Sequence, residues 1–270
     1  MDSISAMHLQ EKKSPRCSNY FHRSSVVHES CRTAMVNWLF QISDALSLNR
    51  ETVGIAMSFL DRFLSSSTAR SAKALDDRHQ FQLAAITAYF IAVKIYEPVQ
   101  LGVDMLVKLC RGFYEQSAIL EMEKDILYSL EWRVSSPTAL DFMRQILELL
   151  TLNEPSFVEN SQRHMGNATS DVHFSTFAPS VVGAACVAIS FRESNVSPSS
   201  DQLSFWEQIC QELELNDSKE FFDVQQRLQS KSSHSKKLRN VGSALTTLSS
   251  RSSYINVGDA RSPVSINVNV

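Results

Sequence analysis

Three charged residues of this sequence lie among apolar neighbours, and their types make them the best candidates for specific chemistry. Asp61 lies within Phe-Leu-Asp-Arg-Phe-Leu, Glu123 has isoleucine and leucine on both sides at helical spacing, and Lys94 closes a long apolar run. An unpaired carboxylate in such a setting costs several kcal/mol, so Asp61 must be paired or turned to solvent. If Lys94 and Glu123 meet at the surface, they offer a partner a donor and an acceptor on an apolar patch.

The sequence contains no recognisable catalytic or metal-binding constellation. It has no glycine-rich phosphate loop, no HExxH and no GxSxG. The seven histidines form no ligand-spaced pair with a carboxylate or a cysteine, and the five cysteines include no CxxC pair. We therefore expect a binding protein rather than an enzyme, with no metal, no cofactor and reduced thiols, as in the cytosol or nucleus. The first residues also lack the apolar segment of a secretory signal.

These charged residues must be positioned by helices, and one apolar stretch predicts the central helix. From Leu83 to Val93 no residue is charged, and Asp77 followed by Gln80 is a helix N-terminus signature. A helix that is apolar all round is buried on every side. The run is in the range of about 10–14 residues that indicates a core helix rather than a membrane span. Its alanines leave room for neighbouring helices to approach closely.

Apolar periodicity predicts further helices on both sides of this centre. In the first half they cover about residues 25–46, 50–65, 102–110 and 115–130, with a polar loop from Ser65 to Asp76. In the second half they cover about 138–152, 156–167, 178–189, 202–213 and 218–230, and the helix at 178–189 is again Ala-rich and apolar. The second half therefore looks like a weaker copy of the first, which indicates two domains, at 25–135 and 136–230.

The composition agrees with a helical globular protein. Of the 270 residues, 43% are hydrophobic and 20% charged, and only seven glycines and seven prolines are present, which favours helices joined by short loops. A net charge of −3 requires neither a nucleic-acid partner nor a membrane. Residues 1–24 are predicted to be mostly disordered, with room for a short helix, and 231–270 form a Ser-rich basic tail that is disordered by composition.

Several motifs within residues 25–135 resemble the cyclin box in their order and spacing. The second half resembles a cyclin C-terminal domain, and Asp171-Val172-His173-Phe174 followed by Ala178-Pro179-Ser180 is most similar to D-type cyclins. The resemblance implies an all-α protein of two tandem five-helix cyclin-fold bundles with disordered termini. The motifs of the first half are Arg32-Thr33-Ala34-Met35-Val36-Asn37-Trp38-Leu39, Glu51-Thr52, Phe59-Leu60-Asp61-Arg62-Phe63-Leu64-Ser65, Phe81-Gln82-Leu83, Ala92-Val93-Lys94-Ile95-Tyr96-Glu97, Met122-Glu123 and Pro137-Thr138.

The resemblance also implies roles for single residues. Arg32 and Asp61 match an internal ion pair that joins the first two helices of the box. Lys94 and Glu123 match the two residues that bind the kinase, and the other interpretation is that Lys94 merely caps its helix while Glu123 pairs with it. The resemblance adds Trp132 and Val134 as apolar kinase contacts. It places a docking groove for RxL-type substrate and inhibitor peptides at Cys31, Met35, Trp38, Arg78, Gln82 and Leu109.

Three features of the termini give weaker signals. Ser14 and Ser262 each precede a proline, which is the minimal sequence for a proline-directed kinase. Lys236-Lys237-Leu238-Arg239 in the basic tail could be read by a nuclear import receptor, although solvated charge on a tail is an equally good interpretation.

The sequence thus predicts a regulatory subunit that binds and activates a cyclin-dependent kinase in cell-cycle control, located in the nucleus and also in the cytoplasm. The expected partners are that kinase and RxL-type proteins, with neither nucleic acid nor membrane. Two alternatives remain open. A cyclin-fold scaffold that does not activate a kinase is kept open by Asn37 and Tyr96, which replace usual acids. A TFIIB-like transcription factor would share the fold, but it would need a CxxC zinc ribbon and basic helices.

Overall fold

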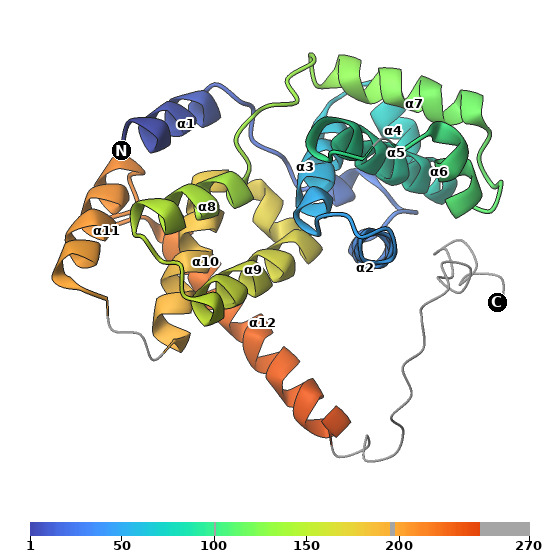
Figure 1. Cartoon of the computed structure of the whole chain (residues 1–270). Coiled ribbons are helices and arrows are strands. Elements are labelled where there is room, and N and C mark those ends of the chain that lie inside the picture. The colour runs from blue at the N-terminus through green and yellow to red at the C-terminus, as the bar shows by residue number, and fades with distance from the viewer. Residues whose placement is uncertain (100, 195–197, 244–270) are drawn as a thin grey trace. The chain divides into compact units, whose positions relative to one another are not determined.

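The computed structural model describes residues 1–99, 101–194 and 198–243 (Figure 1). Within these residues the regular structure is entirely helical, with twelve α-helices, two short 3₁₀ helices and no strand, which confirms the all-α prediction. The described chain forms two compact units. The N-terminal unit contains Arg16–Ser135 with Thr169–Thr176. The C-terminal unit contains Met1–Pro15, Ser136–Ala168 and the described chain from Phe177 onward.

The centre of the N-terminal unit is α5 (Arg78–Tyr96), and every residue from Leu83 to Val93 in it is buried. The Asp77 side chain accepts a hydrogen bond from the backbone N–H of His79 and so caps the helix at the predicted place. Around α5 pack α2 (Glu29–Ala45), α3 (Glu51–Ser65), α4 (Ala69–Asp76) and α7 (Gln116–Ser129), and α6 (Val103–Leu109) packs on α7.

The helix α4 lies where we predicted a polar loop from Ser65 to Asp76. The Thr68 side chain caps it by accepting from the Ser71 N–H, and Ala74 and Leu75 are buried. Only two apolar residues form its inner face, which is too short a pattern for periodicity to identify. Its packing on α5 therefore decides its conformation more than its own sequence does.

Arg32 on α2 and Asp61 on α3 form the buried ion pair that the sequence predicted. The Arg32 Nε lies 3.0 Å from Asp61 Oδ1 and its Nη2 lies 2.8 Å from Oδ2, with side-chain exposures of 3% and 4%. The Tyr20 hydroxyl donates to the same carboxylate at 2.7 Å, and Arg32 Nη1 donates to the Thr169 carbonyl at 2.6 Å. Neither of these two partners was predicted. Together they satisfy groups that the ion pair alone would leave unbonded.

The electrostatics of this cluster favour its charged form. Burial alone would lower the pKa of Arg32, but the adjacent Asp61 carboxylate raises it, and the net pKa lies above its usual value. The pKa of Tyr20 is raised well above its usual value, first by burial and then by the Asp61 charge. Arg32 therefore stays cationic and Tyr20 stays a neutral donor.

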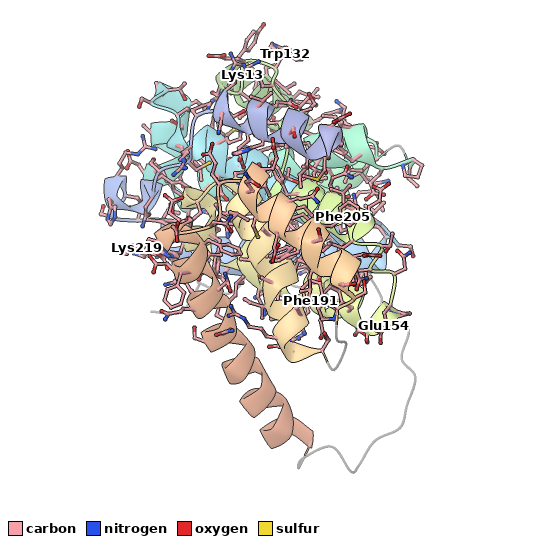
Figure 2. All side chains as sticks on the ribbon, turned by 90° about the vertical axis from the view of Figure 1, so that its left-hand side faces the viewer. Lys13, Trp132, Glu154, Phe191, Phe205 and Lys219 are labelled. Atoms are coloured by element: carbon pink, nitrogen blue, oxygen red, sulfur yellow. The ribbon has the colours of Figure 1, made fainter. Side chains whose placement is uncertain are left out.

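The centre of the C-terminal unit is α10 (Pro179–Glu193), whose residues from Ser180 to Val187 are all buried. It packs against α8 (Ala139–Leu149), α12 (Lys219–Ser243) and α1 (Asp2–Lys12). Phe191 of α10 also forms ring contacts with Phe157 of α9 (Pro155–Ser170), at 4.8 Å, and Trp206 of α11 (Ser200–Glu212), at 6.1 Å. Figure 2 views this unit from the side of α11 and labels Phe191.

The helix α1 occupies part of residues 1–24, for which we predicted mostly disorder with room for one short helix. Ile4, His8 and Glu11 lie on one helical face and are buried against the C-terminal unit. The Glu11 carboxylate accepts from both the N–H and the hydroxyl of Ser180, each at 2.7 Å, at the first turn of α10. Only one of the three inward residues is apolar, so periodicity could not reveal this face.

The last described helix of the chain, α12, is longer than predicted. We predicted a helix at 218–230 followed by a disordered tail, whereas the backbone of α12 remains helical to Ser243. Residues 244–270, including Ser262, lie outside the described residues. In the part of the chain that the structure describes, no helix combines the length and apolar character needed to cross a membrane.

Candidate partner-binding surface

The structure brings Lys94 and Glu123 together at the surface of the N-terminal unit. Lys94 is in the last turn of α5 and Glu123 is in the middle of α7. Their Nζ and Oε1 atoms lie 2.6 Å apart, and the side chains are 46% and 13% exposed. The Lys94 ammonium also lies 4.9 Å from the centre of the Phe90 ring. The aromatic contact and the salt bridge together hold the ammonium in place beside the helix end.

The helices that carry this pair, and the turn after α7, also expose large apolar side chains. Ile95 follows Lys94, Leu120 lies one turn before Glu123, and the Tyr128 and Trp132 rings meet edge to face at 6.0 Å. Their exposed fractions are 45%, 38%, 69% and 61%. We call these four residues, together with Lys94 and Glu123, the α5–α7 patch. Exposed large apolar side chains near polar groups are typical of protein-binding sites.

The turn after α7 displays Trp132 in an unusual backbone conformation. Glu131 and Trp132 both have positive φ, 51° and 58°, and the Trp132 N–H bonds to the Leu127 carbonyl at 2.9 Å in a helix-terminating turn. Such a conformation costs a non-glycine residue roughly 1–3 kcal/mol, and residues of this kind cluster at functional sites. Figure 2 labels Trp132, whose side chain points away from the ribbon.

The second predicted apolar contact, Val134, lies beside Trp132 but is half-buried. Its carbonyl accepts a hydrogen bond from the Tyr96 hydroxyl at 2.9 Å. Tyr96 replaces an acid of the family pattern, and this bond gives it a role that a carboxylate could not perform, because a carboxylate cannot donate. The end of α5 is thereby tied to the segment that follows Trp132.

Sequence reasoning missed the contributions of Ile95, Leu120 and Tyr128 to this patch. One signal was available, because α7 has more apolar residues than its buried row of Ile119, Met122 and Ile126 requires. A helix with apolar residues on a second face presents that face to something other than its own core.

The residues predicted to form the peptide groove differ in accessibility. Met35 and Trp38 are 1% and 3% exposed and belong to the core. A peptide groove lined by them would need both side chains to be accessible, so in this structure they do not present such a surface. Of the other four, Cys31, Gln82 and Leu109 are half-buried and Arg78 is exposed.

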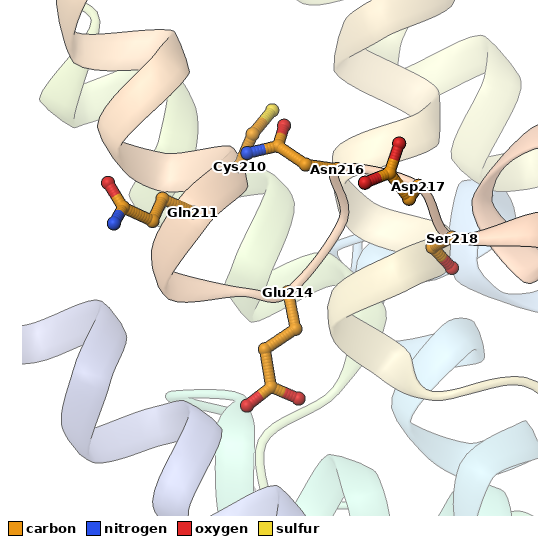
Figure 3. Close-up of a pocket in the computed structure, with 6 residues that line it drawn as sticks. All are labelled: Cys210, Gln211, Glu214, Asn216, Asp217 and Ser218. Atoms are coloured by element: carbon orange, nitrogen blue, oxygen red, sulfur yellow. The ribbon is translucent and has the colours of Figure 1, made fainter.

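A solvent-open hollow lies elsewhere, at the turn between α11 and α12 (Figure 3). Most of its lining is polar, and among the described residues no group of three or more His, Cys, Asp or Glu side chains is placed to hold a metal ion. We assign it no function. Its lining residues are Cys210, Gln211, Glu214, Asn216, Asp217 and Ser218.

Comparison with known proteins assigns the family. The family model for the N-terminal domain of cyclins matches residues 2–135. Cyclin-B1-2 of Arabidopsis thaliana is 29% identical over 208 residues, which are 76% of this chain and 44% of that protein. The G1/S-specific cyclin-D2 of Gallus gallus is 25% identical over 204 residues, which are 73% of this chain and 68% of that protein. The chain thus covers less than half of the length of the plant relative.

Solved structures agree with this fold. A viral cyclin from herpesvirus saimiri superposes with a TM-score of 0.62 at 18% identity, over 83% of this chain and 97% of the viral one. A chain of the yeast RNA Pol II CTD kinase CTDK-1 complex superposes with a TM-score of 0.50 at 14% identity, over 75% of this chain and 66% of that one.

The helical units and the motifs at their centre therefore define a protein of the cyclin fold. The chain belongs to the cyclin family. Relatives of both B type and D type are among its matches, so the D-type subclass stays a prediction.

Proposed function

We propose that this chain is the regulatory subunit of a cyclin-dependent protein kinase, which it binds and activates in cell-cycle control. The observation that carries the proposal is the α5–α7 patch, in which the helices that bring Lys94 and Glu123 to 2.6 Å also expose large apolar side chains. The names of its relatives, which include a G1/S-specific cyclin, support the same function. The chain itself performs no chemistry in this proposal.

The proposed mechanism acts on the kinase's regulatory helix. A protein kinase transfers phosphate only when its β3 lysine is paired with a glutamate on that helix. The α5–α7 patch would pack against the helix and hold it inward, so that binding biases a two-state element. Shifting that element from 1:99 to 99:1 requires about 5.5 kcal/mol of differential binding free energy. A partly apolar interface of roughly 2,000 Å² is large enough to supply it.

Within this interface Lys94 and Glu123 would set the register. The Lys94 ammonium has three donor hydrogens and Glu123 a second carboxylate oxygen, so each can bond to a backbone group of the kinase while the pair is kept. Trp132 and Tyr128 would fill apolar pockets beside them, as aromatic residues do at the centres of protein interfaces.

The test is the double substitution Lys94→Ala/Glu123→Ala. Truncating a hydrogen-bonded charge at an interface costs about 2–5 kcal/mol, so the double variant should lose detectable binding and activation while remaining folded. The measurement is co-purification of a kinase from the native cell lysate, followed by histone kinase activity of the bound fraction and circular dichroism melting of the variant.

The matched control is Asp44→Ala/Arg50→Ala, which removes another exposed ion pair of the same unit, 53% and 57% exposed. This control should bind and activate like the wild type. Full kinase activity with the Lys94/Glu123 variant would refute the mechanism, and unfolding of that variant would show that the pair is structural. If the wild type binds a kinase that the Lys94/Glu123 variant does not bind, but does not activate it, the scaffold alternative is favoured.

We also propose nuclear location, which rests on sequence alone. The basic residues Lys236, Lys237 and Arg239 fall in the part of α12 whose side chains the structure does not describe. Changing all three to glutamine keeps the helix length and removes the charge. A fluorescent fusion of this variant should shift from nucleus to cytoplasm, and an unchanged nuclear signal would remove the proposal.

A further inference from the structure

The segment that follows α1 offers a serine to a proline-directed kinase. Ser14 is followed by Pro15, and residues 15–19 form no helix, while Lys13, Pro15 and Arg16 are exposed. A kinase can bind such a non-helical segment in an extended conformation. The Ser14 side chain is half-buried at the edge of this exposed segment.

The Ser14 hydroxyl makes only long contacts. Its Oγ lies 3.4 Å from the Gln10 carbonyl and 3.5 Å from the Ser136 Oγ. Hydroxyl hydrogen bonds are commonly near 2.7–2.8 Å, so both contacts are weak. Modification of this hydroxyl therefore breaks no strong bond.

Ser14 directly follows the last turn of α1, and side chains of this turn anchor α1 to the rest of the C-terminal unit. Glu11 accepts from Ser180, and Lys12 forms a salt bridge with Glu214 at 2.7 Å. Ser14 is three residues after Glu11, and side chains at this spacing lie on the same side of a helix. The backbone N–H of Ser14 bonds to the Glu11 carbonyl at 2.9 Å, so a turn continues directly from the end of α1 to Ser14.

A phosphate at Ser14 would oppose this docking in three ways. It carries about −1.5 to −2 charges and would lie at the helix C-terminus, where the dipole repels anions. It would repel the buried Glu11 carboxylate. It would also compete with Glu214 for the Lys12 ammonium.

We propose that Ser14 is a phosphorylation site and that its phosphorylation releases α1 from the C-terminal unit. In the transfer, the Ser14 Oγ bonds to the γ-phosphorus of ATP, the bond from that phosphorus to the bridging oxygen breaks, and ADP leaves. The hydroxyl proton passes to the catalytic aspartate of the modifying kinase. Any proline-directed kinase can perform this step, so the inference does not depend on the function proposed above.

The test uses the full chain, ATP and a purified proline-directed kinase of the mitogen-activated class. Mass spectrometry should locate phosphate at Ser14, and hydrogen exchange of the α1 amides should become about tenfold faster, the change expected for about 1.4 kcal/mol. Exchange in α5 should not change. Absence of phosphate at Ser14, while a peptide of residues 10–20 is phosphorylated, would overturn the site. Phosphate with unchanged or slower α1 exchange would overturn the switch.

Two substitutions separate charge from shape. Ser14→Glu should accelerate α1 exchange by about threefold, because it adds one negative charge rather than nearly two. Ser14→Gln has a similar size without the charge and should leave the exchange near that of the wild type. Equal exchange in the two variants would show that charge at Ser14 does not control docking.

Discussion

At the scale of single residues, we expect the carboxylate of Asp61 to contribute strongly to the stability of the N-terminal unit. It binds Arg32 through both oxygens and also accepts from Tyr20. Removing one partner of a buried ion pair costs about 3–5 kcal/mol, because the other charge is left unpaired. We expect Asp61→Ala to lower the free energy of unfolding by this amount in urea denaturation.

The control for this substitution is Asp44→Ala, whose ion pair with Arg50 is about half exposed. Exposed pairs contribute about 0–1 kcal/mol, so this variant should remain near the wild type. Equal stability losses for the two aspartate variants would contradict the assignment of Asp61 as a structural residue.

Two tryptophans of the N-terminal unit have opposite surroundings. Trp38 is 3% exposed and Trp132 is 61% exposed. Trp38→Ala should cost about 3–5 kcal/mol of stability, as core truncations of aromatic residues do. Trp132→Ala should leave the melting temperature nearly unchanged and weaken kinase binding. If Trp38→Ala instead melts like the wild type and loses only RxL-type substrates, the predicted peptide groove exists.

At the scale of elements, α8 and α10 approach closely only because position 183 is glycine. A Cβ at Gly183 would lie 2.5 Å from the Ala139 carbonyl oxygen and 2.9 Å from the Phe142 Cβ, atoms that cannot move without shifting α8. We expect Gly183→Ala to destabilise the protein by about 1–3 kcal/mol, which is the cost of overpacking.

The matched control is Gly166→Ala in α9. A Cβ there meets nothing within 4 Å. Alanine also favours the helix over glycine by up to about 1 kcal/mol, so this variant should be as stable as the wild type or more stable. Thermal melting of the two variants side by side measures the difference, and a stable Gly183→Ala protein would contradict the close packing.

The elements also show what sequence could and could not predict. The helices α5 and α10 were placed correctly because apolar runs of this length are a strong local signal. The helix α4 was missed, and the short helix allowed near the N-terminus could not be placed, because the inner faces of α4 and α1 are short and partly polar. The partners that stabilise such faces are distant in the chain, and the contact between Glu11 and Ser180 spans 169 residues. The family resemblance supplied Lys94 and Glu123, whereas the exposure of Tyr128 and Ile95 required the structure.

At the scale of the whole molecule, buried cysteine thiols and a buried tyrosine hydroxyl predict that the free energy of unfolding falls at high pH. Burial raises the pKa of Cys110 from 9.0 to about 12, that of Cys210 from 9.0 to about 11, and that of Tyr89 from 10.0 to about 12. Because the unfolded chain loses these protons first, their contribution to stability is complete below pH 9. It falls as the pH rises towards the pKa values of the folded state.

Urea denaturation between pH 7 and pH 11, with a reductant present, measures this effect. Each such group can lower the free energy of unfolding by up to about 1.4 kcal/mol per pH unit. The Cys110→Ala variant, which lacks one of these groups, should show a shallower decline than the wild type. A stability that stays constant up to pH 11 would contradict the raised pKa values.

The docking of α1 has a consequence for how this protein is made in the cell. The Lys12–Glu214 contact spans 202 residues, so α1 leaves the ribosome long before the partners that it docks on are synthesised. At about 5–20 residues per second this delay is roughly 10–40 s. During that time Ile4 is exposed, and the N-terminal unit can complete its core before the C-terminal unit can. A chaperone that binds the nascent chain would therefore find α1 available until these partners are synthesised.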